Sequence, residues 1–251
     1  MADRPGRPGR AVTGPLALVG GAEFQRGNER QDGVLAEAAS GRAAYVVCAA
    51  IRERPDQAVA TARRWFATLG VDITELRVRS RGDASVAATV EAAHGAGLVY
   101  LAGGDPGRAV QLLAGTPVWD AIVTAWRGGA ALAGSSAGAM ALCRWTLVRD
   151  RWPQHDTRRP LDALAVVPDC ALLPHFDTFG ERWIPSAQRS LGATVPLIGV
   201  DERTAVLWKR GEWSVNGPGA VTVVVGADRR RFATGETVEG IPAPPGNESA
   251  R

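Results

Sequence analysis

The feature that most limits how this chain can fold is a series of short runs in which every residue is apolar. They lie at residues 16–19, 44–47, 98–101 and 130–133. Strands that are apolar on both faces are typical of parallel sheets covered by helices on both sides. We therefore expect these runs to form neighbouring strands of one buried, mostly parallel sheet.

The segments between these runs have apolar residues at helical spacing. Three such stripes lie at residues 58–69, 86–93 and 118–126, and Thr116 and Pro117 form a helix-starting pair before the third. Repeated strand and helix units predict an α/β fold with three layers, α/β/α. In such folds, ligands bind at the carboxyl ends of the strands.

The second half of the chain has a different pattern. Residues 145–168 are rich in Arg, Asp and Pro, follow no clear period, and form a stretch long enough to be a functional flap. A further buried strand is expected at 171–173, followed by a helix to about residue 192. From residue 196 the pattern predicts short antiparallel β-hairpins appended to the sheet.

Length and composition favour one catalytic domain. The 251 residues are 45% hydrophobic, enough for one substantial core, which we place at residues 15–240. Residues 1–14 and 241–251 are rich in Pro and Gly and are expected to be disordered tails. The net charge is +3, but the basic residues are spread along the chain and all except Lys209 are arginine. We therefore expect no nucleic-acid partner.

Other classes of protein lack support in the sequence. No apolar run approaches the roughly 20 residues of a membrane span, and the first 14 residues have no secretory signal, so a cytoplasmic protein without a membrane partner is expected. Cys48, Cys143 and Cys170 are widely spaced among apolar neighbours, as buried thiols are. We expect no disulfide, metal or cofactor.

The run at 130–133 leads directly into Gly134-Ser135-Ser136-Ala137-Gly138. Gly-x-Ser-x-Gly between a strand and a helix is typical of a nucleophile elbow, which exposes the central hydroxyl at the helix N-terminus. Ser136 is that residue, and the amide of Ala137 would face an oxyanion formed on its substrate. A plain Gly/Ser/Ala turn in an alanine-rich protein would have the same pattern.

A serine nucleophile requires a base, and the chain has three histidines. His94 lies at the end of an expected helix, and His155 lies among charges in the irregular segment. His175 follows an expected buried strand, where α/β proteins place their sites, and is the favoured base. The alternative is a structural histidine packed beside Phe176.

The orienting acid is less clear from the residues. Asp201 and Glu202 follow an expected strand, and since adjacent side chains point in opposite directions, only one can face His175. An ordinary acidic turn would look the same. Gly104 follows another strand, and a glycine there lets a backbone amide approach a ligand as a second oxyanion donor, although a plain strand-to-helix turn is the alternative.

Together these motifs resemble the serine peptidase family of aspartyl dipeptidase (peptidase E) and cyanophycinase. The matching segments are Leu18-Val19-Gly20-Gly21, Ala102-Gly103-Gly104-Asp105, Gly134 to Ala139, Pro174-His175-Phe176 and Val200 to Ala205. The resemblance implies a flavodoxin-like sheet similar to that of class I glutamine amidotransferases, with serine in place of their cysteine. It implies Ser136 as nucleophile, His175 as base and Glu202 as the third member of a triad.

The resemblance is weaker around the expected substrate site. Cyanophycinases have glutamines and spaced arginines at positions where this chain has other residues, namely Pro106, Pro174, Phe179, Glu181 and Ile184. The loss of those groups predicts weak or absent hydrolysis of cyanophycin. Candidate substrate-binding residues near the motifs are Asp105, Arg108, Asp177 and Arg182, of which the two arginines could hold a carboxylate or simply lie on the surface.

The sequence therefore predicts a metal-independent serine hydrolase that cleaves an amide bond in a small peptide. The alternative is a binding or sensor protein that has kept this scaffold and lost catalysis. A glutamine amidotransferase would need a cysteine at the elbow, and Cys143 is about two helical turns further on. For the oligomeric state, a homodimer is only the commonest default.

Overall fold

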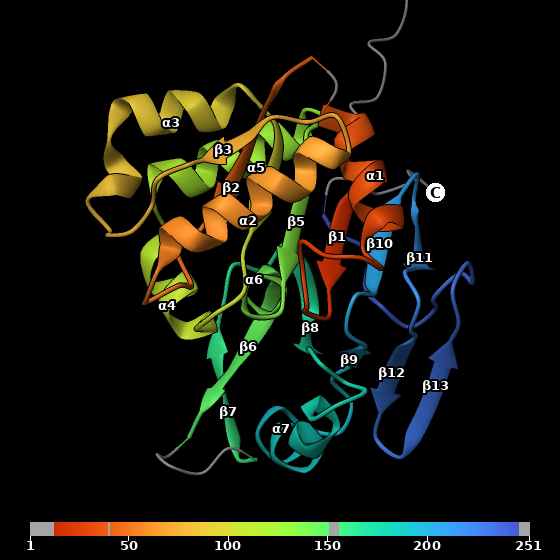
Figure 1. Cartoon of the computed structure of the whole chain (residues 1–251). Coiled ribbons are helices and arrows are strands. Elements are labelled where there is room, and N and C mark those ends of the chain that lie inside the picture. Colours follow the sequence, from red (N-terminus) through yellow and green to blue (C-terminus); the bar gives the residue numbers. More distant parts are fainter. Residues whose placement is uncertain (1–12, 40, 151–155, 246–251) are drawn as a thin grey trace, which may run out of the picture.

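The computed structural model describes residues 13–39, 41–150 and 156–245 of the chain and contains helices and two β-sheets (Figure 1). Within these residues, sheet A has seven strands in the spatial order β11 (Glu212–Asn216), β10 (Ala205–Lys209), β1 (Leu16–Val19), β5 (Ala131–Ser135), β4 (Ala96–Leu101), β2 (Ala43–Val47) and β3 (Ile73–Glu75). The five strands β1, β5, β4, β2 and β3 are parallel, as predicted. Strands β10 and β11 continue the sheet with antiparallel pairing.

Sheet B has six strands in the described residues. Their spatial order is β13 (Asp228–Phe232), β12 (Val221–Val225), β9 (Leu197–Val200), β8 (Val167–Leu173), β6 (Cys143–Arg149) and β7 (Arg158–Asp162). The central strands β6, β8 and β9 are parallel, and the outer pairs are antiparallel. The α/β class is therefore confirmed, with the β-structure divided between two sheets.

Helices lie on both faces of sheet A, which gives the predicted three layers (Figure 1). The helices are α1 (Glu29–Ala39), α2 (Pro55–Thr68), α3 (Ala87–His94), α4 (Pro106–Leu113), α5 (Pro117–Arg127), α6 (Ala137–Leu142) and α7 (Ile184–Leu191), with short 3-10 helices at Asp83–Ser85 and Gly180–Trp183. Along β1, Ala17 and Val19 pack with α1 and α2, whereas Leu16 and Leu18 pack with α5 and α6. This alternation explains why the run is apolar throughout.

Helix α5 begins as its sequence predicts. The hydroxyl of Thr116 accepts a hydrogen bond from the Trp119 amide at 3.4 Å, and Pro117 occupies the first turn. Trp126, near the other end, is fully buried and donates from its indole nitrogen to the Gly14 carbonyl at 2.9 Å. A capped start and a buried aromatic residue at the end fix α5 against sheet A.

The second sheet is the main difference from the sequence prediction. Residues 145–168 do not form an irregular flap over their whole length, because they include most of β6 and all of β7. Strand β7 lies at the edge of sheet B, where Pro160 needs no ladder partner for its missing N–H, so its sequence lacks the apolar pattern of a central strand. The 171–173 strand, part of β8, and β9 also belong to sheet B.

The predicted C-terminal hairpins are divided in the same way. Strands β10 and β11 form a hairpin on sheet A, and β12 and β13 form a hairpin on sheet B. The turn at Asn216 and Gly217 therefore links the two sheets instead of closing a hairpin. Local turn residues indicate a change of chain direction, but long-range strand pairing determines which sheet the next strand joins.

Parts of the expected tails pack on the fold. Thr13 and Gly14 are buried, and the Gly14 amide donates to the Trp126 carbonyl at 2.9 Å. At the other end Ile241 is buried, and the Pro242 carbonyl accepts from the Trp213 indole at 3.2 Å. Residues 1–12 and 246–251 of the expected tails lie outside the described residues. Among those described, no helix is long and apolar enough to cross a membrane.

The expectation of buried thiols is confirmed. Cys48, Cys143 and Cys170 are all buried and free. Burial raises the pKa of the Cys48 thiol to about 12, so it stays protonated at neutral pH. These cysteines are packing residues of the core.

Candidate active site

Ser136 lies in a sharp turn between β5 and α6. Its backbone has φ 47° and ψ −111°, a strained conformation for a residue with a side chain. The turn is fixed to β1, because the Ser136 amide donates to the Val19 carbonyl at the end of that strand, at 2.9 Å. A Cβ atom on Gly138 would lie 2.2 Å from the Leu101 carbonyl oxygen, so glycine is needed where α6 meets β4.

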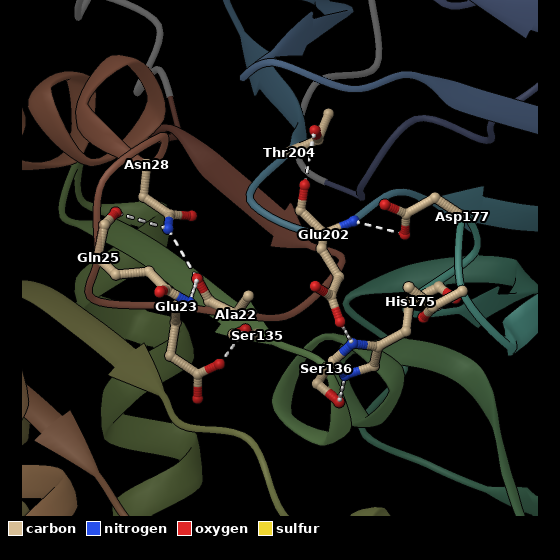
Figure 2. A network of polar contacts seen from close by, with 11 residues as sticks. Ala22, Glu23, Gln25, Asn28, Ser135, Ser136, His175, Asp177, Glu202 and Thr204 are labelled. Carbon is tan, nitrogen blue, oxygen red and sulfur yellow. Dashed lines mark hydrogen bonds and ion pairs between the residues drawn. The ribbon is translucent and has the colours of Figure 1, made fainter.

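The side chains of Ser136, His175 and Glu202 form a continuous chain of contacts (Figure 2). His175 Nε2 lies 3.1 Å from Ser136 Oγ, and His175 Nδ1 lies 2.6 Å from Glu202 Oε1. A carboxylate at Nδ1 favours the tautomer in which Nδ1 carries the proton. Nε2 is then free to accept a proton from the serine hydroxyl.

The loops that carry these side chains bind one another. The His175 amide donates to the Gly20 carbonyl at 2.7 Å, and the Glu202 amide donates to Asp177 Oδ1 at 3.0 Å (Figure 2). The Arg203 amide donates to the Gly21 carbonyl at 2.9 Å. Loops after strands of both sheets are thereby held in one arrangement around Ser136.

The two adjacent carboxylates point in opposite directions. Glu202 faces His175, whereas Asp201 is buried and its Oδ2 accepts from the Ala220 amide at 2.9 Å and from Arg231 at 3.1 Å. Asp201 therefore fixes the loop to the β12–β13 hairpin. Of the two acids, the structure brings Glu202 to the imidazole.

The imidazole is sheltered on one face. The Phe179 ring stacks on His175 with a centroid distance of 4.9 Å and an angle of 21° between the planes. The side chains of His175 and Glu202 remain 19% and 30% exposed, so the pair is only partly shielded from solvent. Stacking limits rotation of the imidazole and keeps both nitrogens directed at their partners.

Two residues of this site carry the backbone amides that the sequence predicts as oxyanion donors. Gly104 and Ala137 line the same cavity as Ser136, and in the described part of the chain neither amide has a recorded hydrogen-bond acceptor. Gly104 has φ 136°, and a Cβ atom there would lie 2.4 Å from the Ala50 carbonyl oxygen. Only glycine is compatible with this backbone position.

The cavity has a volume of about 690 Å³ and opens between sheets A and B. Apolar residues line much of it, namely Pro106, Met140, Leu147, Val148, Leu161, Pro174, Phe179 and Trp183. Within the described part of the chain, its charged lining consists of Asp105 and three arginines from β6 and β7, which are Arg149, Arg158 and Arg159. Positive charge therefore predominates around the cavity.

Sequence reasoning missed these arginines because the segment showed no period. Their signal is visible only in the sheet, where Arg149 and Arg158 are cross-strand neighbours in the β6–β7 ladder. The Arg158 guanidinium lies 3.8 Å from the Trp183 ring centroid, and its buried Nε has no hydrogen-bond partner among the described residues. Burial and the nearby charge of Arg149 lower the pKa of Arg158 to about 10, so it remains cationic at neutral pH.

The four candidate substrate-binding residues have different surroundings. Asp105 lines the cavity, caps α4 and pairs with Arg52 at 2.6 Å. Burial raises the pKa of Asp105, but hydrogen bonds from the Arg108 amide and from Arg52 outweigh burial and lower this pKa below its usual value. The Arg108 guanidinium donates to the Arg79 carbonyl at 2.9 Å. Asp177 and Arg182 line a separate depression of about 380 Å³. Contact of these four with substrate stays a prediction.

Of the other two histidines, only His94 lies among the described residues, and it makes no contact with Ser136 or Glu202 there. His94 ends α3 and is exposed, as the sequence predicts, and His155 lies outside the described residues. In the described part of the chain, no group of three or more His, Cys, Asp or Glu side chains is arranged to hold a metal ion.

Comparisons with known proteins agree with this fold. Residues 16–215 match the family model described as "Peptidase family S51". Cyanophycinases from Trichormus variabilis and a Nostoc species are each 28% identical over 228 residues, which are 87% of this chain and 76% of each relative. The chain belongs to peptidase family S51 and is a serine peptidase.

Solved structures resemble the chain over most of its length. A peptidase from an acI-B1 actinobacterium has a TM-score of 0.78 and 29% identity, covering 91% of this chain and 98% of its own. A putative peptidase E protein from Listeria monocytogenes has a TM-score of 0.62 and 17% identity, covering 82% and 99%. The second likeness concerns the fold alone.

Proposed function

We propose that the protein hydrolyses an amide bond in a small peptide, with Ser136 as nucleophile, His175 as base and Glu202 as the acid that orients the imidazole. The observation that carries this proposal is the Ser136–His175–Glu202 chain of contacts, at 3.1 and 2.6 Å, which opens into the 690 Å³ cavity. Cavities of about 300–1,000 Å³ suit small-molecule ligands.

The reaction follows from this geometry. Ser136 Oγ attacks the substrate carbonyl while its proton passes to His175 Nε2, and Glu202 stabilises the resulting imidazolium. The amides of Gly104 and Ala137 bind the oxyanion, and each such donor is worth roughly 3 kcal/mol of barrier. His175 then protonates the leaving amine. In the second half of the reaction, His175 takes a proton from a water molecule that attacks the acyl-enzyme, and returns a proton to Ser136 Oγ as the acid product leaves.

The charge of the cavity supports an acidic or free C-terminal carboxylate on the substrate. Among the described residues, three arginines line the cavity, and the carboxylate in its lining, Asp105, is paired with Arg52. Arg158 has a buried Nε–H beside the cavity without a hydrogen-bond partner in the described part of the chain. A guanidinium binds a carboxylate through parallel hydrogen bonds, so these arginines favour a short acidic peptide.

The cavity is less suited to the cyanophycin polymer. Pro106 and Pro174 line it and have no side-chain donor, while Phe179 covers His175. Glu181 pairs with Arg229, and Ile184 is buried in α7, and neither lines the cavity. We therefore expect weak or absent release of β-aspartyl-arginine.

A screen of the purified protein tests this function. The substrates are α- and β-linked aspartyl dipeptides, neutral dipeptides and cyanophycin, with Ser136→Ala as the blank. We expect hydrolysis of short acidic peptides that Ser136→Ala abolishes. Absence of turnover on all of them would favour a binding protein, and rapid Ser136-dependent cyanophycin degradation would contradict the substrate assignment.

A further inference from the structure

Glu23 links two segments next to the active site through its side-chain carboxylate. It lies in the turn that follows β1, and its carboxylate accepts a hydrogen bond at each oxygen. The Gly103 amide donates to Oε1 at 2.9 Å, and the Ser135 hydroxyl donates to Oε2 at 2.9 Å (Figure 2 shows the second contact). These donors come from different strands, since Gly103 follows β4 and Ser135 ends β5.

Each of these donors directly precedes a group with a proposed catalytic role. Ser135 precedes the nucleophile Ser136, and Gly103 precedes Gly104, whose amide is a proposed oxyanion donor. The contact with Gly103 is close, because a Cβ atom there would lie 3.0 Å from Glu23 Oε1. One carboxylate therefore sets the spacing between the nucleophile and the Gly104 amide.

The turn that carries Glu23 is itself strongly held. Ala22 and Phe24, on either side of it, have φ angles of 53° and 58°, an unfavourable region for residues with a side chain. Asn28 Nδ2 donates to the Ala22 carbonyl at 2.8 Å and to the Gln25 carbonyl at 3.0 Å (Figure 2). A strained backbone persists only where surrounding contacts determine it, and such strain concentrates at functional sites.

We propose that Glu23 is a positioning residue of the oxyanion hole, which holds the Gly104 amide and Ser136 at the spacing that the tetrahedral intermediate requires. This inference rests on the proposed function. Glu23 does not touch the substrate, and it acts through Gly103 and Ser135. Its contribution is realised mainly in the transition state, when negative charge develops on the substrate oxygen.

The side-chain chemistry predicts a graded response to substitution. Alanine removes both contacts and releases the Gly103–Gly104 segment. Glutamine keeps one acceptor for the Gly103 amide and can donate its NH₂ to the Ser135 hydroxyl oxygen, so most of the geometry survives without the charge. The conservative variant should therefore restore most of what alanine loses.

The test measures kcat and KM for Glu23→Ala and Glu23→Gln on one hydrolysed dipeptide, with active sites counted by fluorophosphonate labelling of Ser136. Glu23→Ala should lower kcat per labelled site roughly 100-fold with KM within about twofold, and Glu23→Gln should recover activity to within about tenfold of the wild type. Glu53→Ala is the matched control, because Glu53 is an exposed carboxylate in the same outer depression as Glu23 and should leave kcat unchanged.

A purely structural Glu23 would give another pattern. Glu23→Ala would then lower the labelled fraction or the melting temperature and leave kcat per labelled site unchanged, which would overturn the inference. Failure of the proposed function is distinguishable, because wild-type Ser136 itself would then resist labelling. Wild-type labelling together with full kcat in Glu23→Ala would contradict only the role of Glu23.

Discussion

Sheets A and B supply different kinds of group to the same cavity. Loops after β4 and β5 of sheet A bring the Ser136 hydroxyl and the amides of Gly104 and Ala137, whose positions follow from strand register and glycine contacts. Strand β8 of sheet B leads to His175, β9 leads to Glu202, and β6 and β7 carry the arginines. In the proposed mechanism, backbone groups bind the developing oxyanion, and long side chains carry the proton and bind the substrate.

This division teaches where the fold tolerates change. A backbone amide moves only if its strand or turn moves, so the sheet A groups cannot be exchanged one at a time. A side chain on a strand can be replaced without altering the ladder, since its neighbours hold the backbone. Substitutions on β6 and β7 should therefore change which peptide binds. Substitutions around Ser136, His175 and Glu202 should instead change kcat.

The largest effect should come from Glu202→Gln, which keeps the shape and removes the charge beside His175 Nδ1. We expect kcat to fall by roughly 10³-fold or more, because an amide can stabilise the wrong imidazole tautomer. Asp201→Asn is the matched control and should keep kcat within a fewfold, since Asp201 binds Ala220 and Arg231. The reverse ranking in steady-state kinetics would assign the acid to Asp201.

An intermediate effect is expected from Arg158→Met, which removes the positive charge and keeps an unbranched apolar side chain beside Trp183. KM for acidic dipeptides should rise about tenfold with little change in kcat, whereas neutral dipeptides with an amidated C-terminus should be unaffected. Arg144→Met is the control, because Arg144 lies on β6, pairs with Asp162 at 3.3 Å and does not line the cavity. Equal losses on acidic and neutral peptides would remove the distinction between the two sheets.

The smallest effect on activity should come from Asp32→Asn, beneath sheet A and away from the cavity. Asp32 is fully buried in α1, and burial, opposed by a 2.7 Å hydrogen bond from the Trp65 indole, raises its pKa to about 7. The folded state therefore binds a proton that the unfolded chain, with a pKa near 3.8, releases, and wild-type stability falls as pH rises between these values.

Asparagine has no such titration, so Asp32→Asn should flatten this part of the pH profile. At pH 8 the variant should have a higher melting temperature than the wild type, and its free energy of unfolding should be larger by at most about 4 kcal/mol. Thermal melts at pH 5 and pH 8 measure both effects, and kcat should stay unchanged. A wild-type melting temperature that does not fall from pH 5 to pH 8 would contradict the raised pKa.

Sequence patterns predicted the parts of this molecule that local chemistry determines. The apolar runs became β1, β2, β4 and β5, and the Gly-x-Ser-x-Gly segment became the sharp turn between β5 and α6 at Ser136, because both depend on residues close together in the chain. The second sheet could not be predicted. Its strands β6 and β7 include charged and edge residues. Strand β6 pairs with β8, which lies about 20 residues further along, and β7 pairs with β6 alone among the described strands.

The same limit applies to the site. Adjacent acids at positions 201 and 202 follow one strand, so the residues left the choice between them open until Glu202 was found at the imidazole. Arg158 and Glu23 were missed because neither lies in a motif. Arg158 reaches the cavity through the pairing of β6 and β7, and Glu23 bridges residues 80 and 112 positions away in the chain.

The central claim is that Ser136 is an activated nucleophile, and covalent labelling tests it most directly. The purified protein is incubated with a fluorophosphonate between pH 6 and 9, and the modified residue is located by peptide mass spectrometry. The account predicts one adduct, on Ser136, that disappears in Ser136→Ala while the melting temperature is retained. Failure to label Ser136 at any pH in this range, or equal labelling of Ser136→Ala, would contradict the account.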